Sequence, residues 1–213
     1  MTRVALLISG RGSNMRAILE ARLAIEPVAV ISNVGAAPGL AVARRMGVAT
    51  AVVDHTAFSS RSEFDSALAA KIDQFNPTLV LLAGFMRILG ESFVERYQRR
   101  LVNIHPSLLP AFPGLHTHRR AIEQGVRIHG CTVHFVTRHL DHGPIIVQAA
   151  VPVHPDDSEP ALAERVLRQE HLIYPEAVRW LIEGKVALDA DNRVRYANFS
   201  SDEARLISPK EAL

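Results

Sequence analysis

Two polar side chains that could do chemistry, Asn103 and His105, stand two residues apart where the apolar run of residues 101–104 ends. Side chains at positions i and i+2 of an extended strand point to the same side. Pro106 follows directly and keeps His105 out of a helix. A hydrogen-bond donor and an acid/base group are therefore expected to face one point in space.

A carboxylate that could complete this group is Asp141, which stands before Gly143 and Pro144 in a later turn. A carboxylate that contacts a histidine orients the ring and favours its charged form. An amide, an imidazole and a carboxylate can together stabilise an oxyanion and move a proton, which is acyl-transfer chemistry without a metal or a nucleophilic side chain. The alternatives are a histidine that serves packing and an Asp that serves turn geometry.

A glycine-containing turn at residues 9–14 follows the first apolar run and opens an amphipathic stretch. The free N–H groups at a helix N-terminus attract phosphate, and Gly12, Ser13 and Asn14 could add donors to them. A dinucleotide-binding fingerprint would need a glycine where Met15 stands and an acidic residue after the second strand. The turn therefore predicts a plain phosphate cradle, and a tight turn that binds nothing is the alternative.

The segment of residues 83–89 is expected at the end of the fourth strand. Ligands of an open parallel sheet bind outside the carboxyl ends of its strands. Met86, Ile88 and Leu89 could pack against a flat heteroaromatic ring. Their backbone amides could form hydrogen bonds with its edge. The alternative is that these side chains belong to the core at the start of a helix.

The composition is that of an ordinary globular chain of 213 residues, with 48% hydrophobic residues and a net charge of +2. A nucleic-acid-binding protein would carry a concentrated basic face, whereas the arginines here are scattered. No apolar run approaches the roughly 20 residues that a membrane-spanning helix needs. The single cysteine, Cys131, excludes an intramolecular disulfide and fits a reducing compartment. These features predict a cytoplasmic protein that binds neither nucleic acid nor a membrane.

Short apolar runs alternate with amphipathic stretches through the first half of the chain. The apolar runs predict strands at residues 4–8, 28–31, 51–53, 79–83 and 101–104. The amphipathic stretches predict helices at residues 14–23, 39–46, 62–75 and 91–97. Ser60 and Glu63 have the spacing of a capping box for the third helix. Strands alternating with helices predict an α/β fold, with a Rossmann-like, mostly parallel sheet flanked by helices.

The second part of the chain departs from this alternation. A loop at residues 106–114 leads to a short helix near residues 117–124. Two apolar runs, at residues 131–136 and 145–151, are close enough in sequence to predict an antiparallel pair.

A long helix is predicted at residues 160–183, capped by Asp157 or Ser158. Pro175 inside it predicts a kink or a break. Residues 189–192 are expected to turn a small hairpin, and no function is expected of the tail at residues 200–213.

These patterns divide the chain into three parts. Residues 1–100 are expected to form a nucleotide- or phosphate-binding half, and residues 101–188 the catalytic and second ligand-binding half of the same domain. Residues 189–213 are expected to add a C-terminal hairpin and tail.

Histidines at positions 116, 118, 139 and 142 could suggest a metal site. The chain has no His-Glu-x-x-His helix, and its single cysteine excludes a cysteine-rich site. We therefore expect no metal.

Taken together, the motifs resemble the folate-dependent formyltransferase family, and within it the enzymes that formylate a ribonucleotide. The likeness extends over residues 3–188. The segments that carry it are residues 8–14, 82–89, 103–110, 113–118, 133–136, 140–144 and 169–175. The Asn-x-His-Pro-Ser-x-Leu-Pro core is shared by the wider family, whereas the Ser-Gly-x-Gly-Ser-Asn opening and the Gln-Glu-His segment narrow the likeness to the ribonucleotide enzymes.

The resemblance implies transfer of the formyl group of 10-formyltetrahydrofolate, as co-substrate, to the amine of glycinamide ribonucleotide in purine biosynthesis. It implies catalysis by Asn103, His105 and Asp141. The residues that would bind the ribonucleotide are Gly12, Ser13, Asn14, Pro106 and Glu170. The residues that would bind the folate are Arg61, Met86, Arg87, Ile88, Leu89, Val136, His139 and Leu140. Residues 110–130 would form a mobile loop over the site, in a monomer or a homodimer.

Three other activities share parts of this pattern. A 10-formyltetrahydrofolate hydrolase gives the formyl group to water, but such enzymes usually carry an extra N-terminal regulatory domain, whereas this chain starts with its first predicted strand. An N-formyltransferase for nucleotide sugars would lack this phosphate turn. A non-catalytic folate or nucleotide sensor would have no need of Asn103, His105 and Asp141 together.

Overall fold

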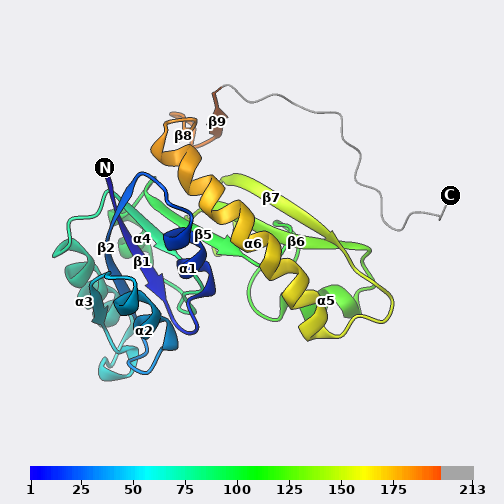
Figure 1. Ribbon diagram of the computed structural model, residues 1–213, viewed down its shortest axis with the longest axis horizontal. Coiled ribbons are helices and arrows are strands. Elements are labelled where there is room, and N and C mark those ends of the chain that lie inside the picture. The colour runs from blue at the N-terminus through cyan, green and yellow to red at the C-terminus, as the bar shows by residue number, and fades with distance from the viewer. Residues whose placement is uncertain (198–213) are drawn as a thin grey trace.

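The computed structural model describes residues 1–197, which form a seven-stranded sheet covered by helices and a separate two-stranded hairpin (Figure 1). The strands of the large sheet are β1 (Thr2–Ile8), β2 (Ile25–Ser32), β3 (Thr50–Val52), β4 (Leu79–Leu82), β5 (Leu101–His105), β6 (Ile128–Phe135) and β7 (Ile145–Pro152). The helices are α1 (Ser13–Glu20), α2 (Pro38–Arg45), the 3-10 helix η1 (His55–Ala57), α3 (Arg61–Asp73), α4 (Glu91–Arg96), α5 (Thr117–Glu123) and α6 (Glu159–Ile182). The hairpin consists of β8 (Val186–Leu188) and β9 (Val194–Tyr196).

The order of strands in the sheet is β3-β2-β1-β4-β5-β6-β7. Strands β1 to β5 pair in parallel, whereas β6 pairs antiparallel with β5 and β7 antiparallel with β6. The predicted α/β fold with a mostly parallel sheet is therefore confirmed, and the C-terminal part adds two antiparallel strands to it. The pairing of β4 with β5 also joins the two predicted halves of the chain in one sheet.

The sheet is buried on both faces because its strands are apolar on both sides. In β1, Val4, Leu6 and Ile8 belong to one core together with side chains of α1, α2 and α6. Ala5 and Leu7 point to the other core, which contains side chains of α3 and α4. Figure 1 shows α6 lying along β6 and β7, with which it makes extensive contact. Near-continuous apolar strands are expected where helices cover both faces.

Serine side chains cap the N-termini of α3 and α6, and the acidic residue near each cap binds a different group from the one predicted. Ser60 Oγ accepts a hydrogen bond from Glu63 N at 3.2 Å, as the capping-box spacing predicted. The Glu63 carboxylate, however, accepts from Ser59 N at 3.1 Å. Ser158 rather than Asp157 caps α6, because Asp157 is engaged by Arg165 at 2.6 Å. That ion pair lowers the pKa of Asp157 to about 2.

The predicted kink or break at Pro175 is not a break, because helix α6 continues through this residue. A proline inside a helix costs about 3 kcal/mol, because it removes a hydrogen bond and crowds the preceding turn. The same part of α6 buries Tyr174, Ala177 and Val178 against the sheet. The Tyr174 hydroxyl also lies 3.1 Å from the carbonyl oxygens of both Leu82 and Val102. Burial of apolar side chains contributes about 1.5–3 kcal/mol each, which is enough to offset the proline.

The end of the described chain forms the predicted hairpin, in which Leu188 pairs with Val194. Asp189 Oδ1 accepts a hydrogen bond from Arg193 N at 2.9 Å, which closes the turn. The tail predicted at residues 200–213 lies outside the described residues. Among residues 1–197, none of the helices combines the length and the apolar character needed to cross a membrane.

Cys131 lies in β6 and its side chain is buried. Burial raises the pKa of its thiol to about 12. The thiol therefore stays protonated at neutral pH and serves as a small apolar group, because thiol nucleophiles react as thiolates.

His129 is another buried polar side chain of β6, with 1% of its surface exposed. Its ring packs edge-on against Phe112 and His118, with ring centroids 5.6 Å and 5.3 Å away. Neither ring nitrogen makes a hydrogen bond of good geometry among the described residues, although the Pro106 backbone is close enough to favour the charged ring slightly. Burial lowers the pKa of His129 from 6.5 to about 4, so the folded protein holds this ring neutral.

This shift makes the folded state sensitive to acid. Because the folded pKa lies below the unfolded one, the unfolded chain takes up the proton first as the pH falls. The contribution of His129 is complete above pH 6.5 and is lost between pH 6.5 and about 4, at roughly 1.4 kcal/mol per pH unit. We expect His129→Leu to flatten the fall in the free energy of unfolding across this window, measured by urea unfolding. The exposed His154→Leu is the control, and an equal slope in both variants would contradict the prediction.

Candidate active site

The carboxyl ends of β1, β4 and β5 lie side by side because these strands are parallel neighbours in the sheet. Each leads into one of the segments that the sequence singled out. Ser9 N donates to the Gly84 carbonyl at 3.1 Å, and Ser9 Oγ accepts from Met86 N at 2.7 Å. The glycine-containing turn after β1, at residues 9–14, is therefore bonded directly to the segment after β4, at the edge of the sheet where ligands of such folds bind.

Asn103 in β5 is oriented by His134 in β6. The two residues stand opposite each other in the antiparallel register, and Asn103 Nδ2 lies 3.2 Å from His134 Nε2. His134 Nδ1 lies 2.9 Å from the carbonyl oxygen of Phe135, which can only accept. Nδ1 therefore carries the proton, and Nε2 accepts from the Asn103 amide. Burial lowers the pKa of His134, in agreement with a neutral ring.

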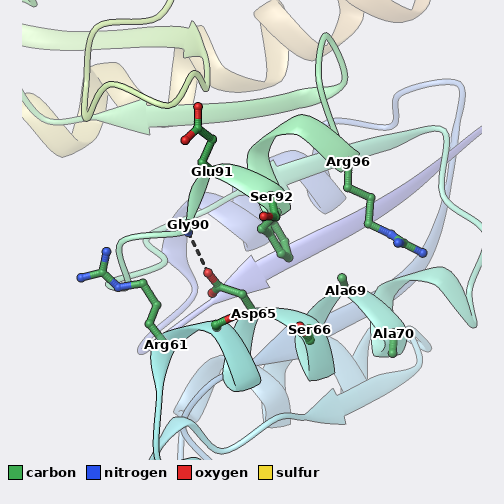
Figure 2. Close-up of a pocket in the computed structure, with 11 residues that line it drawn as sticks. Arg61, Asp65, Ser66, Ala69, Ala70, Gly90, Glu91, Ser92 and Arg96 are labelled. Atoms are coloured by element: carbon green, nitrogen blue, oxygen red, sulfur yellow. Dashed lines mark hydrogen bonds between the residues drawn. The ribbon is translucent and has the colours of Figure 1, made fainter.

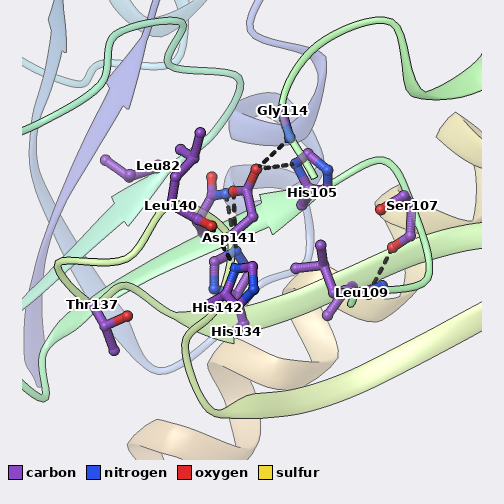
Figure 3. A network of polar contacts seen from close by, with 12 residues as sticks. Leu82, His105, Ser107, Leu109, Gly114, His134, Thr137, Leu140, Asp141 and His142 are labelled. Atoms are coloured by element: carbon purple, nitrogen blue, oxygen red, sulfur yellow. Dashed lines mark hydrogen bonds and ion pairs between the residues drawn. The ribbon is translucent and has the colours of Figure 1, made fainter. Parts of the chain in front are cut away.

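Asp141 brings the remaining members of the group together (Figure 3). Its Oδ2 lies 3.5 Å from His105 Nδ1, and both side chains are 8% exposed. The same oxygen accepts a hydrogen bond from Gly114 N at 2.8 Å. Oδ1 lies 4.0 Å from His134 Nε2. The structure thus brings His105 to the carboxylate of Asp141 directly, and Asn103 to it through His134.

The second ring nitrogen of His105 faces the backbone. His105 Nε2 lies 3.0 Å from the carbonyl oxygen of Phe112, so it carries a proton and donates. Both ring nitrogens therefore face acceptors, which is the arrangement that an imidazolium satisfies completely.

The turn that carries Asp141 is closed by local chemistry. Asp141 has a positive φ of 54°, a conformation that Asp and Asn tolerate better than most residues. Gly143 packs so closely that an added Cβ would lie 1.6 Å from the Phe135 carbonyl oxygen. Phe135 N donates to the Pro144 carbonyl at 2.9 Å and joins the two ends of the turn. The Asp-x-Gly-Pro sequence therefore directs the carboxylate inward.

A cavity of about 550 Å³ opens over this group, within the range of small-molecule sites. Asn103, His105, Asp141 and Pro106 line it. The predicted folate residues that also line it are Arg61, Met86, Arg87, Ile88, Leu89, Val136 and Leu140. His139 is exposed and is not among the lining residues. Met86 and Ile88 are 68% and 52% exposed, so apolar surface is available to a ligand there.

The predicted ribonucleotide residues meet at the start of α1. Gly12 has a φ of 69° at the N-cap, and no side chain caps this helix. Asn14 Nδ2 donates to Glu170 Oε2 at 2.6 Å, which links α1 to α6. Burial raises the pKa of Glu170, although the hydrogen bond from Asn14 opposes the shift. Asn14 Oδ1 is buried without a hydrogen-bond partner among the described residues.

Sequence reasoning missed three groups of this site. His134, the Gly114 amide and the Phe112 carbonyl lay within segments that it quoted, but it assigned them no role. The signal for His134 is its position opposite Asn103, which depends on the register of β5 with β6. The two backbone groups belong to a loop whose path depends on contacts with Asp141 and His105.

Comparison with known proteins identifies the class. Residues 2–178 match the family model described as formyl transferase, which is most of the chain. This chain belongs to the formyl transferase family. The phosphoribosylglycinamide formyltransferase of Escherichia coli (strain K12) is 49% identical over 189 residues, which cover 87% of this chain and 89% of that protein.

Solved structures and multidomain proteins give the same result. The crystal structure of glycinamide ribonucleotide transformylase 1 from Symbiobacterium toebii matches with a TM-score of 0.89 and 47% identity, covering 93% of this chain and 95% of that one. The human trifunctional purine biosynthetic protein adenosine-3 is 44% identical over 90% of this chain, which spans 19% of that protein. The predicted resemblance to the formyltransferases of glycinamide ribonucleotide is therefore confirmed.

The contact between His134 and Asn103 makes a testable prediction. His134→Leu removes the acceptor that orients the Asn103 amide, and we expect kcat of formyl transfer to fall between about 10-fold and 100-fold, with little change in either KM. His134→Gln offers a carbonyl oxygen to the same N–H and should recover part of the loss. Steady-state kinetics would measure both, and full kcat in a natively melting His134→Leu variant would contradict the role.

Proposed function

We propose that this chain transfers the formyl group of 10-formyltetrahydrofolate to the amine of glycinamide ribonucleotide, giving formylglycinamide ribonucleotide and tetrahydrofolate. The observation that carries the proposal is one cavity that combines Asn103, His105 and Asp141 with an exposed apolar segment beside a phosphate turn. Relatives that cover most of the chain bear the name of this activity.

The reaction is a transfer between two nitrogens. The amine lone pair of the ribonucleotide attacks the formyl carbon, and the carbonyl electron pair moves to the oxygen. The tetrahedral intermediate then expels the folate nitrogen. The amine loses one proton and the folate nitrogen gains one, so the proton has only to be moved between them.

Asn103 and His105 are proposed to stabilise the oxyanion. One N–H of the Asn103 amide is held by His134, which leaves the other N–H to donate to the charged oxygen. A protonated His105 supplies a second donor once its Nε2 exchanges the Phe112 carbonyl for the substrate oxygen. Preorganised donors of this kind are usually the largest single contribution to acyl-transfer catalysis. No metal is needed, because these side chains provide the donors.

Asp141 is proposed to hold the His105 ring and to support proton transfer. Its carboxylate faces His105 Nδ1 and accepts from Gly114 N, so its position is set from two directions. The proton can pass through His105 directly or through a water held by Asp141.

The substrates are proposed to bind on either side of this group. The ribonucleotide phosphate would accept from the free N–H groups of Gly12, Ser13 and Asn14 at the uncapped start of α1. Glu170, with Pro106, would contact the ribose or the glycinamide part. The folate would lie against the segment from Met86 to Leu89, with Arg61, Val136 and Leu140 around it.

Substitution of the catalytic group tests the mechanism. Loss of one oxyanion donor costs on the order of 3 kcal/mol, so Asn103→Ala should lower kcat at least about 100-fold. Asp141→Asn should lose at least as much, while its amide oxygen can still accept from Gly114 N and preserve the fold. The assay is the absorbance change on release of tetrahydrofolate, with and without glycinamide ribonucleotide. Release of tetrahydrofolate that does not depend on the ribonucleotide would indicate a hydrolase. Full turnover in either variant would exclude the mechanism.

Two glycines of the proposed phosphate-binding turn allow a comparison between a substitution that should disturb the turn and one that should not. An added Cβ at Gly12 would lie 2.8 Å from Met15 Cε and 3.1 Å from Gly39 Cα, at a positive φ. At Gly10 it would meet nothing within 4 Å. Gly12→Ala should therefore raise KM for the ribonucleotide by about tenfold or more and leave KM for the folate unchanged. Gly10→Ala should change neither value, and an equal effect of both substitutions would count against this site.

A further inference from the structure

Helix α3 buries one carboxylate among apolar side chains. Phe64, Leu68 and Ile72 form the face of α3 that packs on the sheet, and Asp65 lies on the same face with 6% of its surface exposed. Burial raises the pKa of Asp65. Carboxylates are almost never buried this deeply unless a partner compensates for the lost water.

The partner of Asp65 belongs to another element. Asp65 Oδ2 accepts a hydrogen bond from Gly90 N at 2.7 Å (Figure 2). Gly90 is the N-cap of α4 and has no side chain with which to cap that helix. The α3 carboxylate therefore supplies an acceptor and a negative charge at the start of α4, where both are favourable. Asp65 Oδ1 has no hydrogen-bond partner among the described residues, so the hydrogen bond from Gly90 N is the one that compensates for the burial there.

This contact lies beside the active-site cavity. Asp65 and Gly90 line a groove of about 720 Å³ between α3 and α4, and Arg61 lines both this groove and the cavity over Asn103 and His105. The charges of Arg61 and Arg87 are close enough to lower the pKa of Asp65, against the effect of burial. Both arginines belong to the set proposed to bind the folate.

Side chains of two distant residues thereby hold both ends of the segment between β4 and α4. Near its start, Met86 N donates to Ser9 Oγ at 2.7 Å. At its end, Gly90 N donates to Asp65. Arg87, Ile88 and Leu89 lie between these two contacts and line the cavity.

Packing of α3 on α4 does not require this carboxylate. Phe64, Phe93 and Tyr97 already join the two helices in one apolar cluster. The Tyr97 hydroxyl also donates to Asp73 Oδ1 at 2.8 Å, and Arg96 pairs with Asp73. An apolar side chain at position 65 would avoid the desolvation of a charge, so the burial of Asp65 points to a role in the adjoining segment.

We propose that Asp65 is a positioning residue for the folate, which holds the segment of residues 86–89 in its binding conformation through the hydrogen bond to Gly90. This inference rests on the proposed function, because it takes residues 86–89 as folate-binding. Asp65 does not contact the reacting atoms, so its effect should fall on folate binding more than on the chemical step.

The test compares four variants by steady-state kinetics with both substrates. Asp65→Ala removes the acceptor, and KM for 10-formyltetrahydrofolate should rise about tenfold, the value expected for loss of one hydrogen bond to a charged group. KM for the ribonucleotide should change less than about twofold, because the phosphate turn is untouched. Asp65→Asn keeps an acceptor oxygen for Gly90 N and should recover most of the loss.

Two further variants separate positioning from stability. Gly90→Ala would bring its Cβ to 2.8 Å from Asp65 Oδ2 and displace the carboxylate from the opposite side, so it should also raise KM for the folate. It keeps the inference testable if Asp65→Ala does not fold. Asp73→Ala is the control on the same helix, because it removes one hydrogen-bond partner of Tyr97 and the ion-pair partner of Arg96 without touching the segment. It should lower the melting temperature and leave KM for the folate unchanged.

The outcomes are distinct. A selective rise in KM for the folate, restored by Asp65→Asn and reproduced by Gly90→Ala, would support the inference. An equal rise in both KM values, an unchanged KM for the folate, or the same rise in Asp73→Ala would overturn it while leaving the proposed function intact. Absence of ribonucleotide-dependent transfer by the unsubstituted chain would overturn the proposed function, and the inference with it.

Discussion

Asp141 accepts a hydrogen bond from Gly114 N at 2.8 Å, while its carboxylate faces the rings of His105 and His134 at 3.5 Å and 4.0 Å. These partners belong to the loop after β5, to β5 itself and to β6, so one side chain joins three parts of the chain. The carboxylate is nearly buried, and a charge acts more strongly where water is excluded. Its position therefore determines how the imidazole of His105 and the path of the adjoining loop are arranged.

The sheet supplies the rigid part of this arrangement. Parallel pairing of β1, β4 and β5 brings the phosphate turn, the segment at residues 84–90 and Asn103 to one edge. The change to antiparallel pairing at β6 then extends a strand beside that edge and sets His134 opposite Asn103. Side chains on paired strands are held more accurately than side chains on loops, which suits groups that must stabilise a developing charge.

Buried carboxylates recur beside each part of the site. Asp141 lies at the proposed catalytic group, Glu170 contacts Asn14 at the turn proposed to bind phosphate, and Asp65 contacts Gly90 at the end of the segment that lines the cavity. Each is desolvated and bonded to a group from a distant part of the chain. Asn14 Oδ1 and Asp65 Oδ1 are also buried without a partner among the described residues. Polar groups of this kind reduce stability, so a role in binding or positioning a ligand is one reason for a protein to keep them.

Local patterns in the amino-acid sequence determined most of the elements, because the existence of a strand, a helix or a turn depends on residues close in the chain. Alternation of apolar runs with amphipathic stretches predicted the strands of the parallel sheet, and the i and i+2 spacing put Asn103 and His105 on one side of β5. The Ser60 cap likewise depends on a residue one helical turn away.

The tertiary structure alone decided the contacts that depend on register and burial. The continuity of α6 through Pro175 comes from packing of Tyr174 against β4 and β5. The pairs Asn103–His134, Asp65–Gly90 and Asn14–Glu170 join residues that are 31, 25 and 156 positions apart. No local pattern specifies such pairs, because each contact forms only when the sheet and its covering helices bring distant side chains within hydrogen-bonding distance.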